Sequence, residues 1–459
     1  MRGKPDPIHL VAFLLAAVCA AFYWKTGFGA DMDAWRVANS GYWLQATGEY
    51  QASRRPGYPA VEAWAAMLAY LEFQSRGPGW HVPIIASAAV LGLCGLTLYR
   101  LAQAAAARSP LLVTIGFALH PFVFEASGGS FDVVLPTLLL LLALGAALRA
   151  SPVRLGILLG LMIACRASLL PTALGLLAYF SMTVGRRAIA AWVIAAVIGV
   201  LAYAVPLHSF RGHLLPEPLS LRSYPLAWAV LGGYKFLGLP ACVLLLGFFG
   251  RRSRAPAASV LKVFSDRCFV IVVTTVVVMF LLYPYEPAYL VAALPAALLL
   301  IDRIMTLRMR VAWTCALLLN GLIGVPGYTG DARSSTRLRP VQSGQLVALY
   351  RQRLAWMDLP DRLELQAAAG RHAYVLDDGL PVLWFFRRLE IGRGDWQPAK
   401  SDLRNFNGAL HHAGRDRYFV ASWDSALIRE LTSSGYAISR IRLQDRAALA
   451  ALRERDPIR

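Results

Sequence analysis

Apolar runs that are long enough, or nearly long enough, to cross a membrane recur through the first 330 residues of this 459-residue chain. A membrane-spanning helix needs about 20 predominantly apolar residues. The runs that meet or approach this length lie at 8–25, 82–100, 111–127, 131–149, 154–167, 168–184, 188–207, 224–249, 268–284, 287–301 and 311–328. They predict a mainly α-helical, polytopic membrane protein of about eleven transmembrane helices, in which 154–184 is either one broken span or two short ones.

The composition agrees with this class of protein. The chain is 57% hydrophobic and 16% charged, whereas a soluble domain is nearer a quarter charged. A net charge of +19 would suggest nucleic acid as the partner of a soluble protein. Here many of the basic residues lie in short loops between apolar runs, and no nucleic-acid-binding motif accompanies them. We therefore expect no nucleic-acid partner.

The basic loops also predict how the spans are oriented, because cytoplasmic loops collect Lys and Arg. We place the N-terminus in the cytoplasm. The five alternate loops then carry basic residues: Arg100 and Arg108 in the first; Arg149 and Arg154 in the second; Arg186 and Arg187 in the third; Arg251, Arg252, Arg254, Lys262 and Arg267 in the fourth; and Arg303, Arg308 and Arg310 in the fifth. The pattern requires 154–184 to cross twice. It predicts a multi-pass protein of the cytoplasmic (inner) membrane with its C-terminus on the periplasmic or outer face.

The cysteines give no sign of a disulfide or metal framework. All six fall inside apolar runs, and none is paired at metal-ligand spacing. The sequence therefore predicts neither a disulfide framework nor a zinc site.

Residues 1–330 form the predicted transmembrane domain, which has a long first outer loop at 26–81. Within this loop, 60–73 has the helical periodicity and the aromatic residues of a helix lying in the membrane interface. Acidic residues precede 34–45, which is a second predicted helix.

Residues 331–459 are polar enough to form a soluble domain. The predicted buried strands are 373–378 and 417–423, and the predicted amphipathic helices are 345–357 and 425–435. Strands that alternate with helices predict a small α/β domain, which the expected topology places outside.

Charged and polar side chains gather at the outer ends of the predicted spans. A charge at membrane depth is costly and usually faces a cavity or a partner. The residues that share this position are Asp31, Asp33, Arg36, His120, Glu125, Asp132, Arg166, His208, Arg211, His213, Glu286 and Tyr289. Their convergence on one side of the membrane is the main functional signal in the sequence.

Several of these residues also have a purely structural interpretation. Acids favour helix N-termini, and arginines near a membrane surface reach the lipid headgroups. The residues open to this interpretation are Asp31, Asp33, Asp132, Arg166, Arg54 and Arg55.

The functional interpretation uses the same groups together. Arginine forms bidentate, always-charged pairs with phosphate, so Arg54 and Arg55 on the outer rim would hold a lipid-linked phosphate. A nearby carboxylate would accept the proton of an attacking hydroxyl. The combination suits transfer of a group from a phospholipid carrier to a hydroxyl acceptor.

The first outer loop resembles that of the GT-C superfamily of membrane glycosyltransferases, which includes protein O-mannosyltransferases and lipid A aminoarabinose transferases. These enzymes show an acid with Arg three residues on, then Gly followed by an acid and an aromatic residue, then a basic residue before Pro. The matching residues are Asp33, Arg36, Gly48-Glu49-Tyr50 and Arg55-Pro56-Gly57-Tyr58-Pro59.

Later segments extend the resemblance over about residues 8–330. The SFD of 130–132 resembles the acid that opens a later span in the family, and 164–171 resembles the family's turn with Arg and a following Pro. The segment 285–295 resembles a late span that usually carries Arg before Tyr. Ala288 stands in that place, so the resemblance does not supply the arginine contact to phosphate or sugar that the family would have there.

The resemblance implies an inverting glycosyltransferase that uses a polyprenyl-phosphate sugar. It assigns Asp33 as the catalytic base, with Asp31 as a rival, Arg36 as the structural partner of Asp33, and Arg55 as a phosphate contact. Together with the charged and polar groups at the outer span ends, the predicted substrate-binding residues are Arg36, Arg54, Arg55, Tyr58, Asp132, Arg166, Arg211, Glu286 and Tyr289. The expected partners are the polyprenyl-phosphate-linked sugar, an unidentified acceptor and membrane lipid. No cofactor is implied, although a divalent metal held by the two acids, as in oligosaccharyltransferases, is an alternative.

Two other functions stay open. A flippase or transporter of lipid-linked sugars would also hold arginines and acids in a membrane cavity, but it predicts an internal repeat and charges near the bilayer midplane. A membrane scaffold whose soluble domain binds a partner would not need the acidic and basic residues of the first outer loop.

Overall fold

The structure is a computed structural model whose described residues fall into two compact units. The described residues are 7–28, 32–53, 57–74, 79–129, 131–210, 225, 228–238, 241–242, 244, 267–283, 287–322, 327–328, 338–339, 371–376, 396–399, 409–412, 414, 416–421 and 424–441. The first unit comprises Met1–Trp24, Ile84–Ala204 and Leu215–Leu349, and the second Lys25–Pro83, Val205–Leu214 and Tyr350–Arg459. This grouping separates 25–83 from its flanking spans, and the expected boundary at residue 330 stays a prediction.

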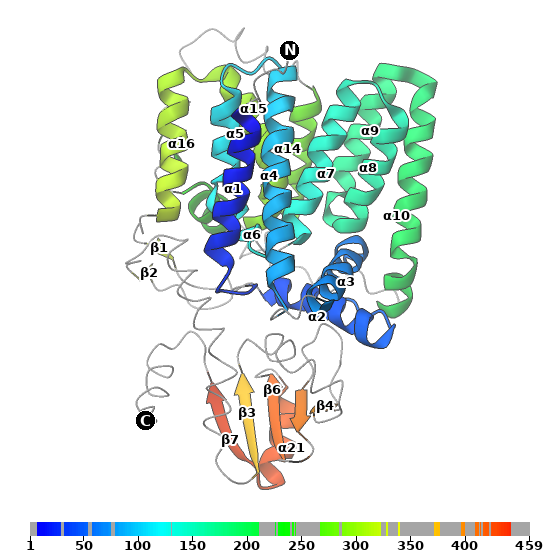
Figure 1. Ribbon diagram of the computed structural model, residues 1–459, viewed down its shortest axis with the longest axis vertical. Helices are drawn as coiled ribbons and strands as arrows, with labels where there is room; N and C mark the ends of the chain where they lie inside the picture. Colours follow the sequence, from blue (N-terminus) through cyan, green and yellow to red (C-terminus); the bar gives the residue numbers. More distant parts are fainter. Residues whose placement is uncertain are drawn as a thin grey trace. The chain divides into compact units, whose positions relative to one another are not determined.

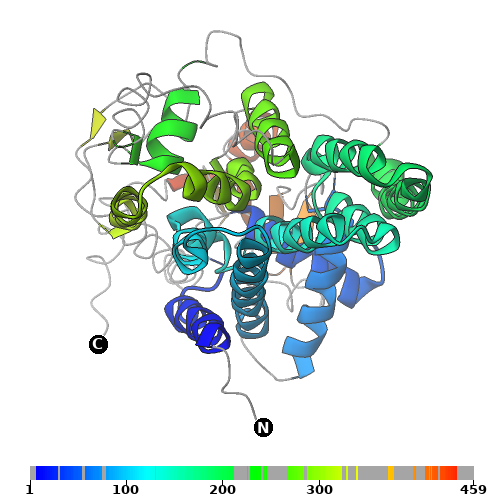
Figure 2. The same ribbon diagram turned by 90° about the horizontal axis from the view of Figure 1, so that it is seen from above.

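The first unit is a helical bundle (Figures 1 and 2). Its main helices are α1 (Pro7–Tyr23), α4 (His81–Ala104), α5 (Pro110–Ala118), α6 (Pro121–Ala126), α7 (Phe131–Leu148), α8 (Pro152–Cys165), α9 (Leu170–Val184), α10 (Ala188–Phe210), α14 (Arg267–Leu282), α15 (Leu294–Ile304) and α16 (Leu307–Leu322). Short 3₁₀ segments η1 (Ala167–Leu169), η2 (Gly185–Arg187) and η5 (Pro287–Ala293) and a π-helix η4 (Trp228–Leu237) complete the described part. The predicted mainly helical class is confirmed.

The helices follow the predicted spans with one difference, and the structure selects one of the two arrangements predicted for 154–184. The run 111–127 is divided into α5 and α6, because Pro121 cannot continue the hydrogen bonding of α5. The segment 154–184 forms two helices, α8 and α9, which meet at Arg166 in an extended backbone conformation. The run 224–249 lies partly outside the described residues.

Two helices among the described residues are long and apolar enough to cross a membrane, His81–Ala104 and Ala167–Ala204. Four shorter apolar helices accompany them, Ile8–Tyr23, Asp132–Leu148, Pro152–Cys165 and Arg267–Leu282. The number of about eleven spans therefore stays a prediction.

Small residues bring α8 and α10 into close contact. A Cβ atom added to Gly156 would lie 2.8 Å from the carbonyl oxygen of Ala191, and one added to Gly160 would lie 2.7 Å from Cβ of Ile198. Glycines four residues apart on one helix face let a neighbouring backbone approach closely, which is a common device of membrane helices.

The second unit begins with a helical hairpin. It consists of α2 (Met32–Thr47) and α3 (Pro59–Gln74), which pack against each other. Both helices were predicted, at 34–45 and 60–73. The hairpin carries the acid of the resemblance, Asp33, in the first turn of α2.

The C-terminal part of the second unit is a five-stranded mixed sheet with the order β4-β5-β6-β3-β7. The strands are β3 (His372–Leu376), β4 (Trp396–Ala399), β5 (Ala409–His412), β6 (Arg417–Ala421) and β7 (Ala437–Ile441). β3 is parallel to both β6 and β7, whereas β4, β5 and β6 pair antiparallel.

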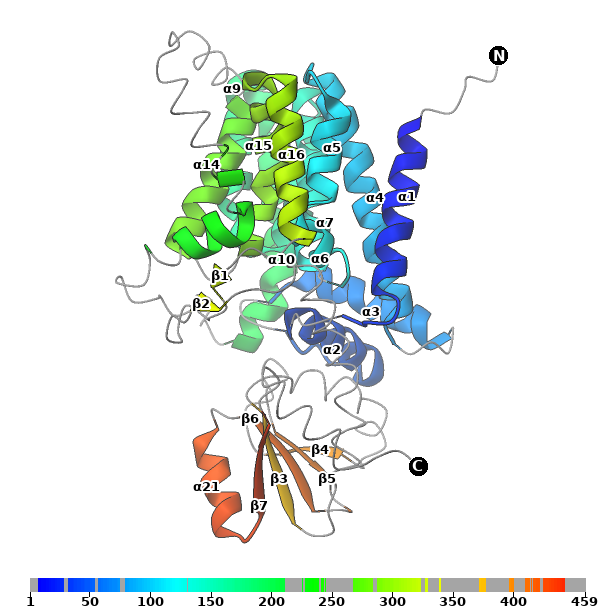
Figure 3. The same cartoon turned by 90° about the vertical axis from the view of Figure 1, so that its left-hand side faces the viewer.

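Helix α21 (Ser425–Ser433) packs on one face of this sheet (Figure 3). Its Ile428 and Leu431 join Val375 and Val420 in the domain core. The helix starts with a side-chain cap, since Asp424 accepts a hydrogen bond from the backbone N–H of Leu427. The predicted strands 373–378 and 417–423 and helix 425–435 are thus found, and the predicted helix 345–357 lies outside the described residues. A separate two-stranded pair joins β1 (Gly327–Tyr328) to β2 (Leu338–Arg339).

Candidate functional site

The predicted catalytic base lies next to an arginine in the second unit. Asp33 and Arg36 are one turn apart on α2, and Nη1 of Arg36 lies 2.8 Å from Oδ1 of Asp33. Both side chains are partly exposed, at 21% for Arg36 and 14% for Asp33. Asp33 thus has an ion-pair partner on its own helix, and its assignment as the catalytic base stays a prediction.

A buried glutamate that the sequence analysis did not single out holds the connection between α2 and α3. Glu62 on α3 is 1% exposed. Its Oε1 accepts hydrogen bonds from the backbone N–H of Ser53 (2.7 Å) and from the Ser53 hydroxyl (2.5 Å), and its Oε2 accepts one from the Tyr50 hydroxyl. Burial raises the pKa of Glu62, and the hydrogen bonds from Ser53 and Tyr50 oppose that effect.

These hydrogen bonds hold the residues that directly precede the predicted phosphate-binding arginines, and close packing holds the residues that follow them. Gly57 adopts a φ of +93°, and a Cβ atom at that position would lie 3.0 Å from Pro206. The next residue, Tyr58, is 6% exposed, so its ring is packed inside the unit.

Several predicted site residues lie outside the described part of the chain. They are Asp31, Arg54, Arg55, Arg211 and Glu286. Their assignments stay predictions.

In the first unit, three predicted site residues come together from distant parts of the sequence. Asp132 opens α7, Arg166 lies between α8 and η1, and Tyr289 belongs to η5. Nη1 of Arg166 lies 3.1 Å from the backbone carbonyl oxygen of Asp132 and 3.4 Å from its Oδ2. The Cζ atom of Arg166 lies 4.7 Å from the ring centroid of Tyr289, which is a cation–π distance.

Both members of this pair are buried, and their predicted contact with the substrate stays a prediction. Asp132 is 2% exposed and Arg166 is 4% exposed. An arginine that reaches lipid headgroups keeps its guanidinium in water, which Arg166 does not. Asp132 likewise is bound to an arginine of another helix and is not only an N-cap.

His120 is packed among aromatic side chains of the first unit. It is fully buried, and its ring centroid lies 4.6 Å from that of Phe236 and 6.3 Å from that of Phe122. This histidine is therefore a packed residue of the first unit, covered by neighbouring side chains.

A second buried ion pair joins three helices of the first unit, and the sequence analysis treated its arginine only as a loop charge. Asp302 on α15 is 2% exposed and is paired with Arg310 on α16. Asp302 also accepts a hydrogen bond from the backbone N–H of Arg108, and Arg310 donates one of 2.7 Å to the hydroxyl of Ser109. The pair ties α15 and α16 to the start of α5.

The C-terminal sheet carries a polar group at the turn between β5 and β6. Asp416 accepts a hydrogen bond from the Tyr436 hydroxyl and lies 2.8 Å from Nε of Arg371. The hydrogen bond from Tyr436 and the charge of Arg371 lower the pKa of Asp416. Among the residues that the structure describes, no three His, Cys, Asp or Glu side chains are grouped to hold a metal ion.

Comparisons with known proteins identify the fold. No family model matches the chain, and no curated protein matches it either. Similar solved structures include ArnT from Cupriavidus metallidurans bound to undecaprenyl phosphate, at 12% identity and a TM-score of 0.52, and ArnT from Cupriavidus metallidurans in the apo state, at 13% identity and a TM-score of 0.53. Each match covers 83% of this chain and 84% of that chain. The chain thus shares its fold with these ArnT structures, which agrees with the family resemblance of its sequence.

Proposed function

We propose that the chain is an inverting glycosyltransferase of the inner membrane. It moves a sugar from a polyprenyl-phosphate donor to a hydroxyl acceptor on the outer face. The observation that carries the proposal is the fold, which extends over 83% of the chain and is that of a protein solved with undecaprenyl phosphate bound. Because a fold alone does not fix the chemistry, the proposal also rests on the acidic and basic residues of the two units.

Asp33 is the proposed general base. The acceptor hydroxyl gives its proton to the Asp33 carboxylate while its oxygen attacks the anomeric carbon of the sugar. The bond between that carbon and the phosphate oxygen breaks, and polyprenyl phosphate leaves with the electron pair. This single displacement inverts the anomeric centre. Arg36, at 2.8 Å, keeps the base oriented and ionised, and Asp31 is the alternative base.

Arginines meet the charge that develops on the leaving phosphate. Arg54 and Arg55 are the proposed phosphate contacts, with Arg211 as a further one. Guanidinium groups suit this role because they stay charged and bind phosphate oxygens in pairs. The support for the first two is their position between Ser53 and Gly57, on a segment whose described ends are held by Glu62 and by close packing.

Asp132, Arg166 and Tyr289 form the proposed substrate-contacting group of the first unit, to which Glu286 is added as a prediction. Tyr58 is a separate proposed substrate contact, in the second unit. A buried ion pair is costly to keep unless its geometry is well supported, and here an aromatic ring and a backbone carbonyl support it. The C-terminal α/β domain is proposed to lie outside and to present the acceptor.

The test is a transfer assay on purified protein in detergent with a panel of radiolabelled polyprenyl-phosphate sugars and crude membrane acceptors. Wild type is compared with Asp33→Asn and Asp31→Asn. We expect one donor to be consumed, and we expect Asp33→Asn to lower the rate at least 100-fold, which is the usual contribution of a general base, while donor binding is retained.

Full activity of both variants would remove both acids from the mechanism. Binding of a donor without consumption by wild type would instead support the flippase alternative, which no described contact favours at present.

A further inference from the structure

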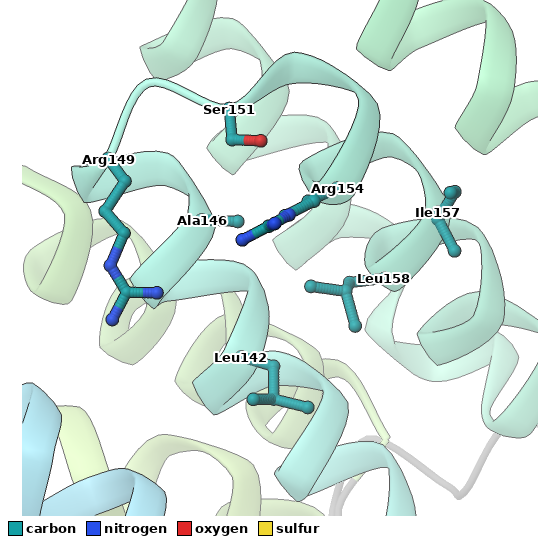
Figure 4. A pocket seen from close by; sticks show the side chains of 7 residues that line it. All are labelled: Leu142, Ala146, Arg149, Ser151, Arg154, Ile157 and Leu158. Atoms are coloured by element: carbon teal, nitrogen blue, oxygen red, sulfur yellow. The ribbon is translucent and has the colours of Figure 1, made fainter.

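An open groove of about 490 Å³ lies at the turn that joins α7 to α8 (Figure 4). Its polar wall consists of Arg149, Ser151 and Arg154. The groove lies at the end of the α7–α8 hairpin opposite to Asp132 and Arg166, because those residues occupy the start of α7 and the end of α8. It is thus separate from the group to which we assign substrate contacts.

The polar wall of the groove is purely cationic. Figure 4 shows the guanidinium of Arg154 extending toward Ala146 of α7, with Ser151 and Arg149 at the rim. None of the described residues that line the groove is acidic. Ser151 is the N-cap residue of α8, and its hydroxyl makes no capping hydrogen bond to that helix. The site therefore offers two guanidinium groups and a hydroxyl to an anion.

The other wall of the groove is apolar and open to the surroundings of the helices. Leu142 and Ile157 line it and are each 39% exposed. Leu148 and Val153, at the ends of the same two helices, are 47% and 51% exposed. Large exposed apolar surfaces mark contacts with lipid or with another molecule. A ligand of this groove therefore has an anionic head and a hydrocarbon body.

We propose that the groove binds one anionic diacyl phospholipid of the inner leaflet. Its phosphodiester lies between Arg149 and Arg154, and its acyl chains lie along the exposed leucine and isoleucine side chains of α7 and α8. Basic pockets between helices on the cytoplasmic side suit phospholipid headgroups. Arginine suits phosphate because its fork of N–H donors matches phosphate oxygens.

Binding at this turn has a consequence for the rest of the hairpin. The lipid contacts α7 and α8 at one end, and the ion pair of Asp132 and Arg166 joins them at the other. A ligand that binds only the folded state stabilises it by mass action. We therefore expect the phospholipid to raise the melting temperature of the protein. This inference rests on the predicted topology and not on the proposed transferase activity.

The test uses the purified full-length protein in a neutral detergent. Phosphatidylglycerol and phosphatidylcholine with the same acyl chains are titrated, and bound lipid is counted by native mass spectrometry. Melting temperatures are measured in parallel. The variant is Arg149→Gln with Arg154→Gln. The matched control is Arg186→Gln with Arg187→Gln, which removes the same charge from the exposed turn at η2 without touching the groove.

We expect phosphatidylglycerol to bind more tightly than phosphatidylcholine and to raise the melting temperature. The groove variant should bind phosphatidylglycerol about tenfold more weakly or worse, because each basic residue near the membrane surface raises the affinity for an anionic lipid severalfold. The control variant should stay within about twofold of wild type. Equal binding by the groove variant and wild type, or equal binding of the two lipids, would overturn the proposal.

Polyprenyl phosphate is also an anionic lipid, so it is added as a competitor. If polyprenyl phosphate displaces phosphatidylglycerol from the groove at a concentration below that at which phosphatidylglycerol itself binds, the assignment is overturned in favour of the carrier lipid. A failed transfer assay would leave the groove proposal intact, since lipid counting does not require turnover.

Discussion

At the scale of single residues, Asp132 and Asp302 are both buried in the first unit, and each is paired with an arginine of another helix. The net gain from such a pair is small, because two charges must leave water. Loss of one partner is costly, since it leaves the other charge buried and alone. Each pair thus ties two helical segments of the first unit together, and this contribution to stability can be measured apart from the substrate contact proposed for Asp132 and Arg166.

We expect Arg166→Gln and Asp132→Asn each to destabilise the protein by about 3–5 kcal/mol, because each leaves half of a buried ion pair. The double variant should cost less than the sum of the single variants, since neither charge is then left alone. Thermal unfolding of detergent-solubilised protein measures the effect, with exposed Arg186→Gln as the control. Additive costs would show that the two side chains do not interact.

Glu62 should make the second unit more stable in acid than at neutral pH. Burial raises its pKa above the ordinary value of 4.5, so the folded state favours the protonated form. The stability it contributes is full below about pH 4.5 and is lost as the pH rises through the raised pKa. Glu62→Gln cannot ionise, so the melting temperature of that variant should depend less on pH across this window. Parallel curves for wild type and variant would contradict the assignment.

The residue scale also shows what the sequence could predict of the site. It singled out Asp33, Asp132, Arg166 and Tyr289, because charges and aromatic groups at span ends are visible in one dimension. The sequence did not single out Glu62, because an acidic residue within a predicted amphipathic helix is expected to lie on the solvent-exposed face. Only the structure brings Tyr50 and Ser53 to its carboxyl group.

At the scale of elements, the α2–α3 hairpin depends on close contact between its two helices. A Cβ atom added to Gly41 of α2 would lie 2.6 Å from the backbone carbonyl carbon of Ala65 on α3. Backbone atoms cannot move aside as a flexible side chain can. The hairpin positions both Asp33 and Glu62, so a change at Gly41 should reach the proposed base.

Gly41→Ala should therefore separate α2 from α3, lower stability by about 1–3 kcal/mol as overpacking does, and reduce transfer activity. The matched control is Gly145→Ala in α7, where an added Cβ meets nothing within 4 Å. That change should be neutral or stabilising by up to about 1 kcal/mol, because alanine favours helices over glycine. Equal effects of both substitutions on melting temperature would refute the contact argument.

The spacing of apolar residues predicted most of the described helices and strands, because that spacing follows from the local repeat of each element. The helices α2, α3 and α21 and the strands β3 and β6 all fall on predicted segments. Hydropathy treated 111–127 as one span, because it does not respond to the single Pro121 that divides α5 from α6. The sheet order could not be predicted, since β3 lies between β6 and β7 through pairings distant in sequence.

At the scale of the whole molecule, a short motif resemblance predicted the fold, although the chain has low overall identity to the similar solved structures. The similar solved structures share 12% and 13% identity with the chain. Such a fold tolerates wide substitution, because membrane helices need mainly apolar character and small residues at contacts. The closest motif match is therefore a short one, in the first outer loop, at Asp33, Arg36 and Arg55.

The proposed mechanism requires a definite orientation of the chain in the membrane, which the basic loops predict. We expect the turn at residue 150, between α7 and α8, to face the cytoplasm and the C-terminal domain to face outside. Ala150→Cys and Ser434→Cys, each introduced singly after replacement of the six native cysteines, test both positions. Both native side chains are exposed, so the new thiols should be accessible.

A membrane-impermeant maleimide should label Ser434→Cys in intact cells and Ala150→Cys only after the membrane is permeabilised. The physical reason is that the reagent does not cross the membrane, so it reaches only thiols on the outer face of intact cells. Labelling of both positions in intact cells would contradict the topology, and with it the inner-leaflet position of the α7–α8 groove. Protection of both would place the C-terminal domain in the cytoplasm, where it could not present an acceptor to an outer-face transferase. The experiment therefore tests the outer-face transferase proposal and the inner-leaflet groove proposal before any substrate is identified.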